Sequence, residues 1–211
     1  MGGNWKKKGD KMKNILIKIV LLCLFLFIPE EVSAKNSSIN INDKNIVISE
    51  VMTYDQVVEA IAKDNRISIE EAKLQMPLAT SRSALGALSA TYRTVAKQVE
   101  ITPWYKIQMR FYCETSEGGG YWGIVRILNV SMDRNYLNMS KQFGGTVYAN
   151  LESAYKIFFI VNGDFFDNGT TTYGGGVNVA VGSSVTINFQ ASYTSNHYKY
   201  AYSEEYIQTQ Y

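Results

Sequence analysis

Histidine is almost absent from this chain of 211 residues, with His197 its only representative. Zinc sites that need several imidazoles are therefore excluded. A Ser-His-Asp triad would have to use His197, and no G-x-S-x-G sequence accompanies it. Glycine clusters at 118–120 and 174–176 lack the lysine of a P-loop and the spacing of a dinucleotide-binding motif. We expect neither of these catalytic centres, and no nucleotide site.

Cysteine is equally scarce, since the chain has only Cys23 and Cys113. Cys23 lies in the signal segment described below, so the remaining thiol has no partner for an intrachain disulfide. A Cys113–His197 dyad is the one nucleophilic pairing that the sequence permits. However, the alternation from Ile107 to Cys113 predicts that the thiol lies on the apolar face of a strand, where cysteine behaves as a small hydrophobe. We therefore predict that the protein is not an enzyme.

Long hydrophobic runs are absent except near the N-terminus, where residues 19–28 read "IVLLCLFLFI". This run is too short to span a bilayer, which needs roughly 20 residues. Lysines at 11, 13 and 18 surround its start, and Val32 and Ala34 occupy the small-residue positions of a cleavage site. The pattern predicts a signal peptide over residues 1–34, cleaved after Ala34, with translation starting at Met1 or Met12. We expect a secreted, extracellular protein without stable membrane insertion after cleavage.

Positive charge is concentrated in this signal segment. Its removal takes away six lysines and three acidic residues, which changes the net charge from +2 to about −1. No long basic stripe remains, so we expect no nucleic-acid partner.

Helical signals are confined to a short part of the chain. Residues 35–50 are polar and predict a flexible leader, and residues 51–90 predict a short helical unit. Thr53 with Gln56, and Ser68 with Glu71, have the spacing of capping boxes. They predict two helices, over 54–64 and 69–75, that form a helical hairpin before Pro77.

From about Thr91 the hydrophobic period changes from helical to two. Short runs rich in Tyr, Val and Thr alternate with turn residues through 91–211, which predicts an antiparallel β-sandwich of about eight strands. In residues 184–194, Val185, Ile187, Phe189, Ala191 and Tyr193 share one face. A three-residue Gly182–Ser184 connection would pair Val181 with Val185 and form a hairpin over 177–193.

That hairpin alternates apolar and polar residues like the stem of a pore-forming toxin. A transmembrane strand needs about 9–11 such residues, and its first arm supplies five. A toxin or bacteriocin-like membrane-active factor is therefore the alternative function, and a Cys/His hydrolase is the third.

Exposed aromatic residues are the main candidates for ligand binding. Their rings could stack on sugars, although aromatic residues also cover cores and form cross-strand pairs. Tyr198, Tyr200 and Tyr202 are expected to share one face of the last strand. The full candidate set is Trp104, Tyr121, Trp122, Tyr198, Tyr200 and Tyr202.

The segment "VNGDFFDNGTTTYGGG", residues 161–176, is the one stretch with the composition of a cation loop. Asn168-Gly169 predicts a type I′ turn that pairs Asp167 with Thr170 and Phe166 with Thr171. Asp164 and Asp167 are three residues apart and would point to opposite faces of a regular strand. Calcium takes six to eight oxygen ligands, which two carboxylates on opposite faces do not supply. We therefore expect no cofactor, and calcium bound at Asp164 and Asp167 is the one metal hypothesis.

The stretches "RFYCETSEGGGYWGI", "SKQFGGTVYANLE" and "VNGDFFDNGTTT" resemble an uncharacterised family of small secreted proteins from Gram-positive bacteria. The resemblance covers about residues 91–203 and implies secretion and a β-rich domain. That family is a domain of unknown function, so no functional residue is implied. Together, these features predict a secreted binding module whose partner is an extracellular glycan or a cell-surface protein.

Overall fold

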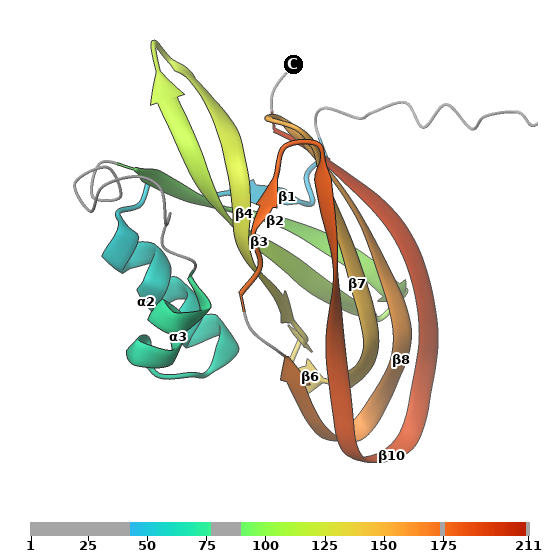
Figure 1. Cartoon of the computed structure of the whole chain (residues 1–211). Helices are drawn as coiled ribbons and strands as arrows, with labels where there is room; N and C mark the ends of the chain where they lie inside the picture. Colours follow the sequence, from blue (N-terminus) through green and yellow to red (C-terminus); the bar gives the residue numbers. More distant parts are fainter. Residues whose placement is uncertain (1–42, 77–89, 174–175, 210–211) are drawn as a thin grey trace, which may run out of the picture. The chain divides into compact units, whose positions relative to one another are not determined.

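The fold is mainly β, with antiparallel sheets and two helices in the computed structural model, which describes residues 43–76, 90–173 and 176–209 (Figure 1). The expected signal peptide and the first half of the expected leader lie outside these residues. The same holds for residues 77–89 of the expected helical unit.

The first sheet has the strand order β1-β2-β3-β4-β9, and all four pairings are antiparallel. Its strands are β1 (Ile46–Ile48), β2 (Thr91–Thr102), β3 (Tyr105–Gly118), β4 (Tyr121–Asp133) and β9 (Val179–Ala180). Strand β1 belongs to the segment predicted as a leader. That prediction is wrong for residues 46–48, because they pair with Val95–Lys97 of β2.

The second sheet consists of β7 (Gln142–Ser153), β8 (Lys156–Tyr173) and β10 (Ser183–Gln208), and it closes on itself. The first part of β10 pairs with one edge of β7, and the remainder pairs with β8, which occupies the other edge of β7. Figure 1 shows β8 and β10 as long, bent ribbons. Two short strands, β5 (Asn135–Tyr136) and β6 (Met139–Ser140), form a separate hairpin.

The predicted turn at Asn168-Gly169 is wrong. Strand β8 continues through it, with Asn168 opposite Ser195 and Thr170 opposite Ser192. Gly169 instead has a φ of +126° opposite an irregular segment of β10, where Tyr193 also has positive φ. A Cβ atom at Gly169 would lie 2.8 Å from the Ser192 carbonyl oxygen, which explains why glycine stands there.

The predicted 177–193 hairpin is also wrong. Val179 pairs with Ile127 of β4, whereas Val185 pairs with Ala149 of β7, so the two arms join different sheets. The predicted facing holds in part, since Ile187 and Phe189 are buried while Thr186, Asn188 and Gln190 are exposed. It fails at Tyr193, which is 94% exposed because the backbone leaves regular strand geometry there.

The two helices begin at the predicted capping residues. Helix α2 (Tyr54–Asn65) has Thr53 as its N-cap in a complete capping box with Gln56, and α3 (Ile69–Gln75) has Ser68 as its N-cap. Arg66 ends α2 in the left-handed conformation, with a φ of 57°. Local hydrogen bonding to the first free backbone N–H groups thus fixes both starts.

Two buried clusters hold these elements together. The larger contains residues of both sheets, among them Phe111 and Ile127 of the first sheet and Phe159 and Val161 of the second. The smaller joins the helices to the first sheet through Val57, Ile61 and their neighbours, which pack with Tyr92, Tyr112 and Leu128. The first sheet therefore buries residues on both faces.

Candidate functional site

The predicted aromatic residues do not form a single platform. Trp104 is 78% exposed in the turn between β2 and β3, as expected from Pro103. Tyr121 is 74% exposed at the start of β4, and Trp122 beside it packs partly on the core under the Arg93 guanidinium. Strand β3 separates the two positions, and its 14 residues span roughly 45 Å. Trp104 therefore cannot act together with Tyr121 and Trp122 on one small ligand.

Tyr200 and Tyr202 lie on the outward face of β10, where they are 52% and 55% exposed. Tyr198 does not share that face, so this part of the prediction is wrong. A register shift between His197 and Lys199 turns Tyr198 toward the core, where its ring contacts Tyr105 edge-on at 5.8 Å. Its hydroxyl lies 3.0 Å from Thr102 Oγ1, and Lys141 Nζ lies 4.3 Å from its ring centroid.

Further aromatic residues continue the outward face across the closed sheet. The ring of Phe158 on β8 lies 4.8 Å from Tyr206 on β10 and 6.1 Å from Tyr148 on β7. Lys156 Nζ lies 4.4 Å from the ring centroid of Tyr206. We call these aromatic residues with their polar neighbours the tyrosine face: Tyr148, Phe158, Asn162, Asp164, Tyr200, Tyr202, Glu204 and Tyr206.

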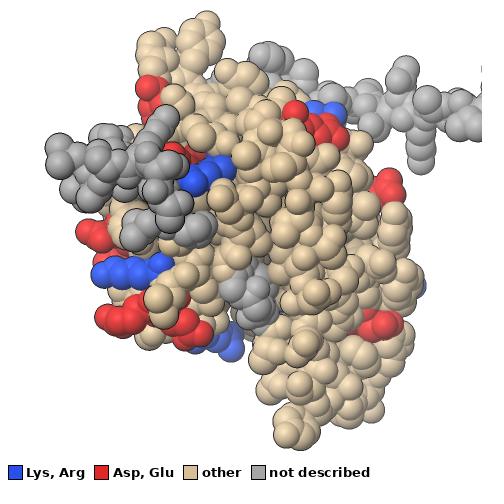
Figure 2. Space-filling view, in the orientation of Figure 1, with Lys and Arg blue, Asp and Glu red and all other residues tan. Residues whose placement is uncertain are grey.

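Polar side chains fix the orientation of the exposed rings. The Tyr200 hydroxyl donates to Asn162 Oδ1 at 2.8 Å, and the Tyr202 hydroxyl donates to Glu204 Oε1 at 2.6 Å. The bond to the Glu204 carboxylate raises the pKa of Tyr202. Figure 2 shows few charged side chains over β7, β8 and β10 in this view, whereas charges of both signs gather over the helices. The exposed rings are therefore held in place by an amide on β8 and a carboxylate on β10.

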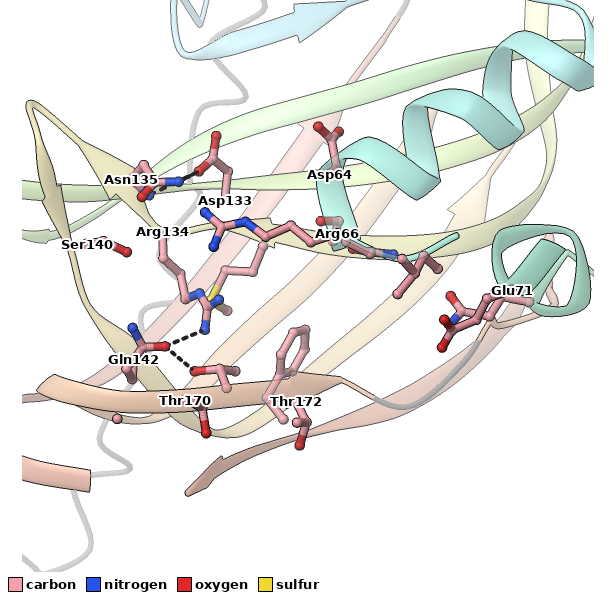
Figure 3. Close-up of a pocket in the computed structure, with 18 residues that line it drawn as sticks. Asp64, Arg66, Glu71, Asp133, Arg134, Asn135, Ser140, Gln142, Thr170 and Thr172 are labelled. Carbon is pink, nitrogen blue, oxygen red and sulfur yellow. Dashed lines mark hydrogen bonds between the residues drawn. The ribbon is translucent and has the colours of Figure 1, made fainter. Parts of the chain in front are cut away.

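A polar cleft of about 490 Å³ forms a second candidate site (Figure 3). The loop between α2 and α3, the end of β4 and the far part of β8 contribute its walls. The polar side chains that line it include Asp64, Arg66, Glu71, Asp133, Arg134, Asn135, Ser140, Gln142, Thr170, Thr171 and Thr172.

Arg110 neutralises the two aspartates in the cleft wall. Its Nη1 lies 2.7 Å from Asp64 Oδ1, and its Nη2 lies 2.9 Å from Asp133 Oδ2. The Tyr112 hydroxyl also donates to Asp64, and the backbone and side-chain N–H groups of Asn135 donate to Asp133. Burial, together with the bond to Asp64, raises the pKa of Tyr112, so its hydroxyl remains a donor at physiological pH.

Cys113 and His197 are not brought together. Cys113 is fully buried in the core of the first sheet, where burial raises its pKa and its Sγ lies 3.6 Å from the Phe111 carbonyl oxygen. His197 lies on the exposed surface of β10, with Nε2 2.8 Å from Asp164 Oδ1 and its ring against Phe166. The histidine therefore has a carboxylate neighbour but no thiol beside it.

The two candidate metal ligands have different partners. Asp164 accepts from His197, whereas Asp167 lies 2.6 Å from Lys141 Nζ. Among the residues that the structure describes, no group of three or more His, Cys, Asp or Glu side chains could hold a metal ion. Among the described residues, no third carboxylate, histidine or cysteine joins Asp164 and Asp167 to complete a calcium site.

Sequence reasoning did not select Arg66, Arg134, Phe158 or Tyr206. The outward position of Phe158 follows the strand period and could have been found from its buried neighbours Ile157 and Phe159. No local signal joins Arg66 to Arg134, because they follow different elements and meet only through the packing of the helices on the first sheet.

Among the described residues, no helix has the length and apolar character needed to cross a membrane. No family model, curated protein or solved structure matches this chain. The resemblance to a family of small secreted proteins thus stays a prediction.

Proposed function

We propose that this chain is a secreted, non-enzymatic binding module that holds an extracellular glycan through the tyrosine face. The supporting observation is the pair of half-exposed rings, Tyr200 and Tyr202, each held by a hydrogen bond to a neighbouring side chain. We further propose that the two sheets form a β-sandwich and that α2 and α3 form a helical hairpin on it.

The chemistry of the tyrosine face suits a sugar better than a charged ligand. The faces of the rings can pack on the apolar C–H surface of a pyranose, while carboxylate and amide oxygens of Asp164, Glu204 and Asn162 can accept bonds from its hydroxyls. Rings already fixed by hydrogen bonds lose little conformational freedom on binding, which favours affinity.

Export belongs to this proposal. The hydrophobic run at 19–28 and the cleavage signal at Ala34 favour secretion, and the mature protein would begin at Lys35. An extracellular location would expose the tyrosine face to cell-surface glycans and proteins.

Neither other function gains support. The toxin hypothesis depended on a 177–193 hairpin, and its two arms pair with different strands. The hydrolase hypothesis required a reactive thiol at Cys113, which is fully buried.

Retention on insoluble bacterial cell wall tests the proposal. The purified protein should bind, and the double substitution Tyr200→Ala/Tyr202→Ala should weaken retention about tenfold or more, because buried aromatic anchors dominate binding energies. Tyr121→Ala is the matched control, since it removes an exposed tyrosine from another part of the fold. Unchanged retention of the double variant, or an equal loss in the control, would refute the assignment to the tyrosine face.

A further inference from the structure

The polar cleft has two guanidinium groups without a carboxylate partner. Among the described residues, neither Arg66 nor Arg134 forms an ion pair, although both line the cleft. The two nearby aspartates are already held by Arg110. A cleft in which Arg110 neutralises two of the three lining acids, and in which two further cations remain, is suited to an anionic group.

Neighbouring hydrogen bonds fix the position of Arg134. Its Nη1 donates to Gln142 Oε1 at 3.4 Å, and the Thr171 hydroxyl donates to the same oxygen at 3.1 Å. The Thr171 oxygen in turn accepts from the Phe143 N–H, so the donor and the acceptor are fixed in each of these hydrogen bonds. The Tyr105 hydroxyl donates to the Arg134 carbonyl oxygen at 2.7 Å. Arg134 is therefore preorganised, with only one of its five N–H groups bonded to a described residue.

Arg66 reaches the same region from the end of α2. Figure 3 shows its side chain extending toward Asp133 and Arg134, and the Arg66 side chain is exposed. Burial lowers the pKa of Arg134, and the neighbouring charge of Arg66 adds to this effect. The two guanidinium groups thus repel one another, and an anion between them would relieve the repulsion.

Thr170 and Thr172, which line the cleft on β8, offer hydroxyl oxygens that can accept hydrogen bonds from a ligand. The hydroxyl groups of Thr170 and Thr172 donate to the carbonyl oxygens of Ser192 and Gln190, each at 3.4 Å, so their lone pairs remain for a ligand. Ser140 adds a hydroxyl that can donate or accept. Glu71 on α3 also lines the cleft, which disfavours a second anionic group at that side. The lining is therefore suited to a molecule with several hydroxyls and one negative end.

We propose that this cleft binds a carboxylate-bearing sugar unit, with its carboxylate between Arg66 and Arg134 and its hydroxyls along Thr170, Thr172 and Ser140. The volume of about 490 Å³ lies in the range of small-molecule sites, roughly 300–1,000 Å³. The cleft shares no residue with the tyrosine face, so this site goes beyond the proposed function and is tested separately from it.

Calorimetric titration with glucuronate, glucose and inorganic sulfate tests the site. Glucuronate should bind, and Arg66→Gln should weaken it about tenfold or more, because a charge-assisted hydrogen bond is lost. Arg66→Gln is preferred over Arg134→Gln because the Arg66 side chain is exposed and belongs to neither buried cluster. Lys63→Gln is the matched control, since it removes a charge from the last turn of the same helix outside the cleft.

Each outcome decides the proposal. Weakened glucuronate binding in Arg66→Gln, with unchanged binding in Lys63→Gln and much weaker binding of glucose, supports it. No glucuronate binding, or equal binding of glucose, overturns it. Equal competition by sulfate overturns the assignment to a sugar. Tyr200→Ala/Tyr202→Ala should leave glucuronate affinity unchanged. The proposal for the cleft can therefore fail without affecting the proposal that the tyrosine face binds a glycan, and the reverse also holds.

Discussion

Replacing Lys97 with methionine should destabilise the protein by removing a buried charge that joins the two sheets. Lys97 lies on β2, and its Nζ is 2.9 Å from Glu205 Oε2 and 2.8 Å from the Tyr206 carbonyl oxygen, both on β10. Asp43 Oδ2 lies 3.0 Å away on its other side. The Lys97 side chain is only 11% exposed. Methionine keeps all but the terminal atom of the unbranched side chain, so the substitution removes mainly the ammonium group and its charge.

The expected loss is about 2–3 kcal/mol. Breaking a buried ion pair costs about 3–5 kcal/mol because it leaves an uncompensated charge. That figure is reduced here because Glu205 and Asp43 keep 25% and 21% of their side-chain exposure. For a domain of this size, the melting temperature should fall by roughly 5–10 °C.

Urea unfolding followed by tryptophan fluorescence measures this loss. Lys199→Met, an exposed lysine on β10, is the control and should change stability by less than about 0.5 kcal/mol. The double variant Lys97→Met/Glu205→Gln should be about 1 kcal/mol more stable than Lys97→Met, because it removes one of the carboxylates left without a cationic partner. A loss below about 0.5 kcal/mol in Lys97→Met, or no recovery in the double variant, would refute the reasoning.

The pH dependence of this cluster has a defined sign. Burial opposes ionisation of Asp43, but hydrogen bonds from Asn45 and Lys97 outweigh it and lower its pKa. Its contribution is therefore present above the unfolded pKa, near 4, and is lost as the pH falls through the lower folded value. Burial likewise opposes the charge of Lys97, but Glu205 and Asp43 raise its pKa. Its contribution is present at neutral pH and is lost only as the pH rises through that raised value.

Other substitutions and conditions test the packing. Gly163→Ala should cost more than about 2 kcal/mol in urea unfolding, since its Cβ would lie 2.7 Å from Gly145 Cα and 2.4 Å from a backbone oxygen; a neutral effect would contradict this close approach. Burial raises the pKa values of Tyr105 and Tyr112, so their contribution to stability should be constant below pH 10 and fall above it by roughly 1.4 kcal/mol per pH unit for each tyrosine. Tyr105→Phe and Tyr112→Phe should leave the tyrosinate absorbance of the folded protein near pH 10 unchanged, and a loss of that absorbance in either variant would contradict the burial. In the chain that begins at Lys35, which lacks Cys23, Cys113 should react with a thiol reagent only in denaturant, and rapid reaction of the folded protein would show that the thiol is accessible.

Local features of the sequence predicted the parts of the fold that depend on near neighbours. The capping residues Thr53 and Ser68 marked both helix starts because their bonds reach only three residues along the chain. Alternation placed Cys113 in the core because the strand period is a property of each strand alone.

Features that depend on distant pairing could not be predicted in this way. Asn168-Gly169 has the local preference for a tight turn, but the pairing of β8 with β10 keeps it inside a strand. The bulge beside His197 turned Tyr198 inward, so simple alternation misplaced it relative to Tyr200. The cleft needs the end of α2, the end of β4 and the far part of β8 together, and no local pattern encodes that meeting.

The closure of β7 and β8 by β10 also determines the order in which the protein can complete its fold. Strand β10 is the last described strand, yet it supplies core residues such as Phe189 and Ile207 and pairs along both β7 and β8. A growing chain that ends before Ser183 would leave edges of β7 and β8 unpaired and their apolar faces partly uncovered. Pairing over such sequence separations is slow, because the loop must be closed before the contacts form. The closed sheet can therefore be completed only after the whole of β10, through Gln208, is available to pair.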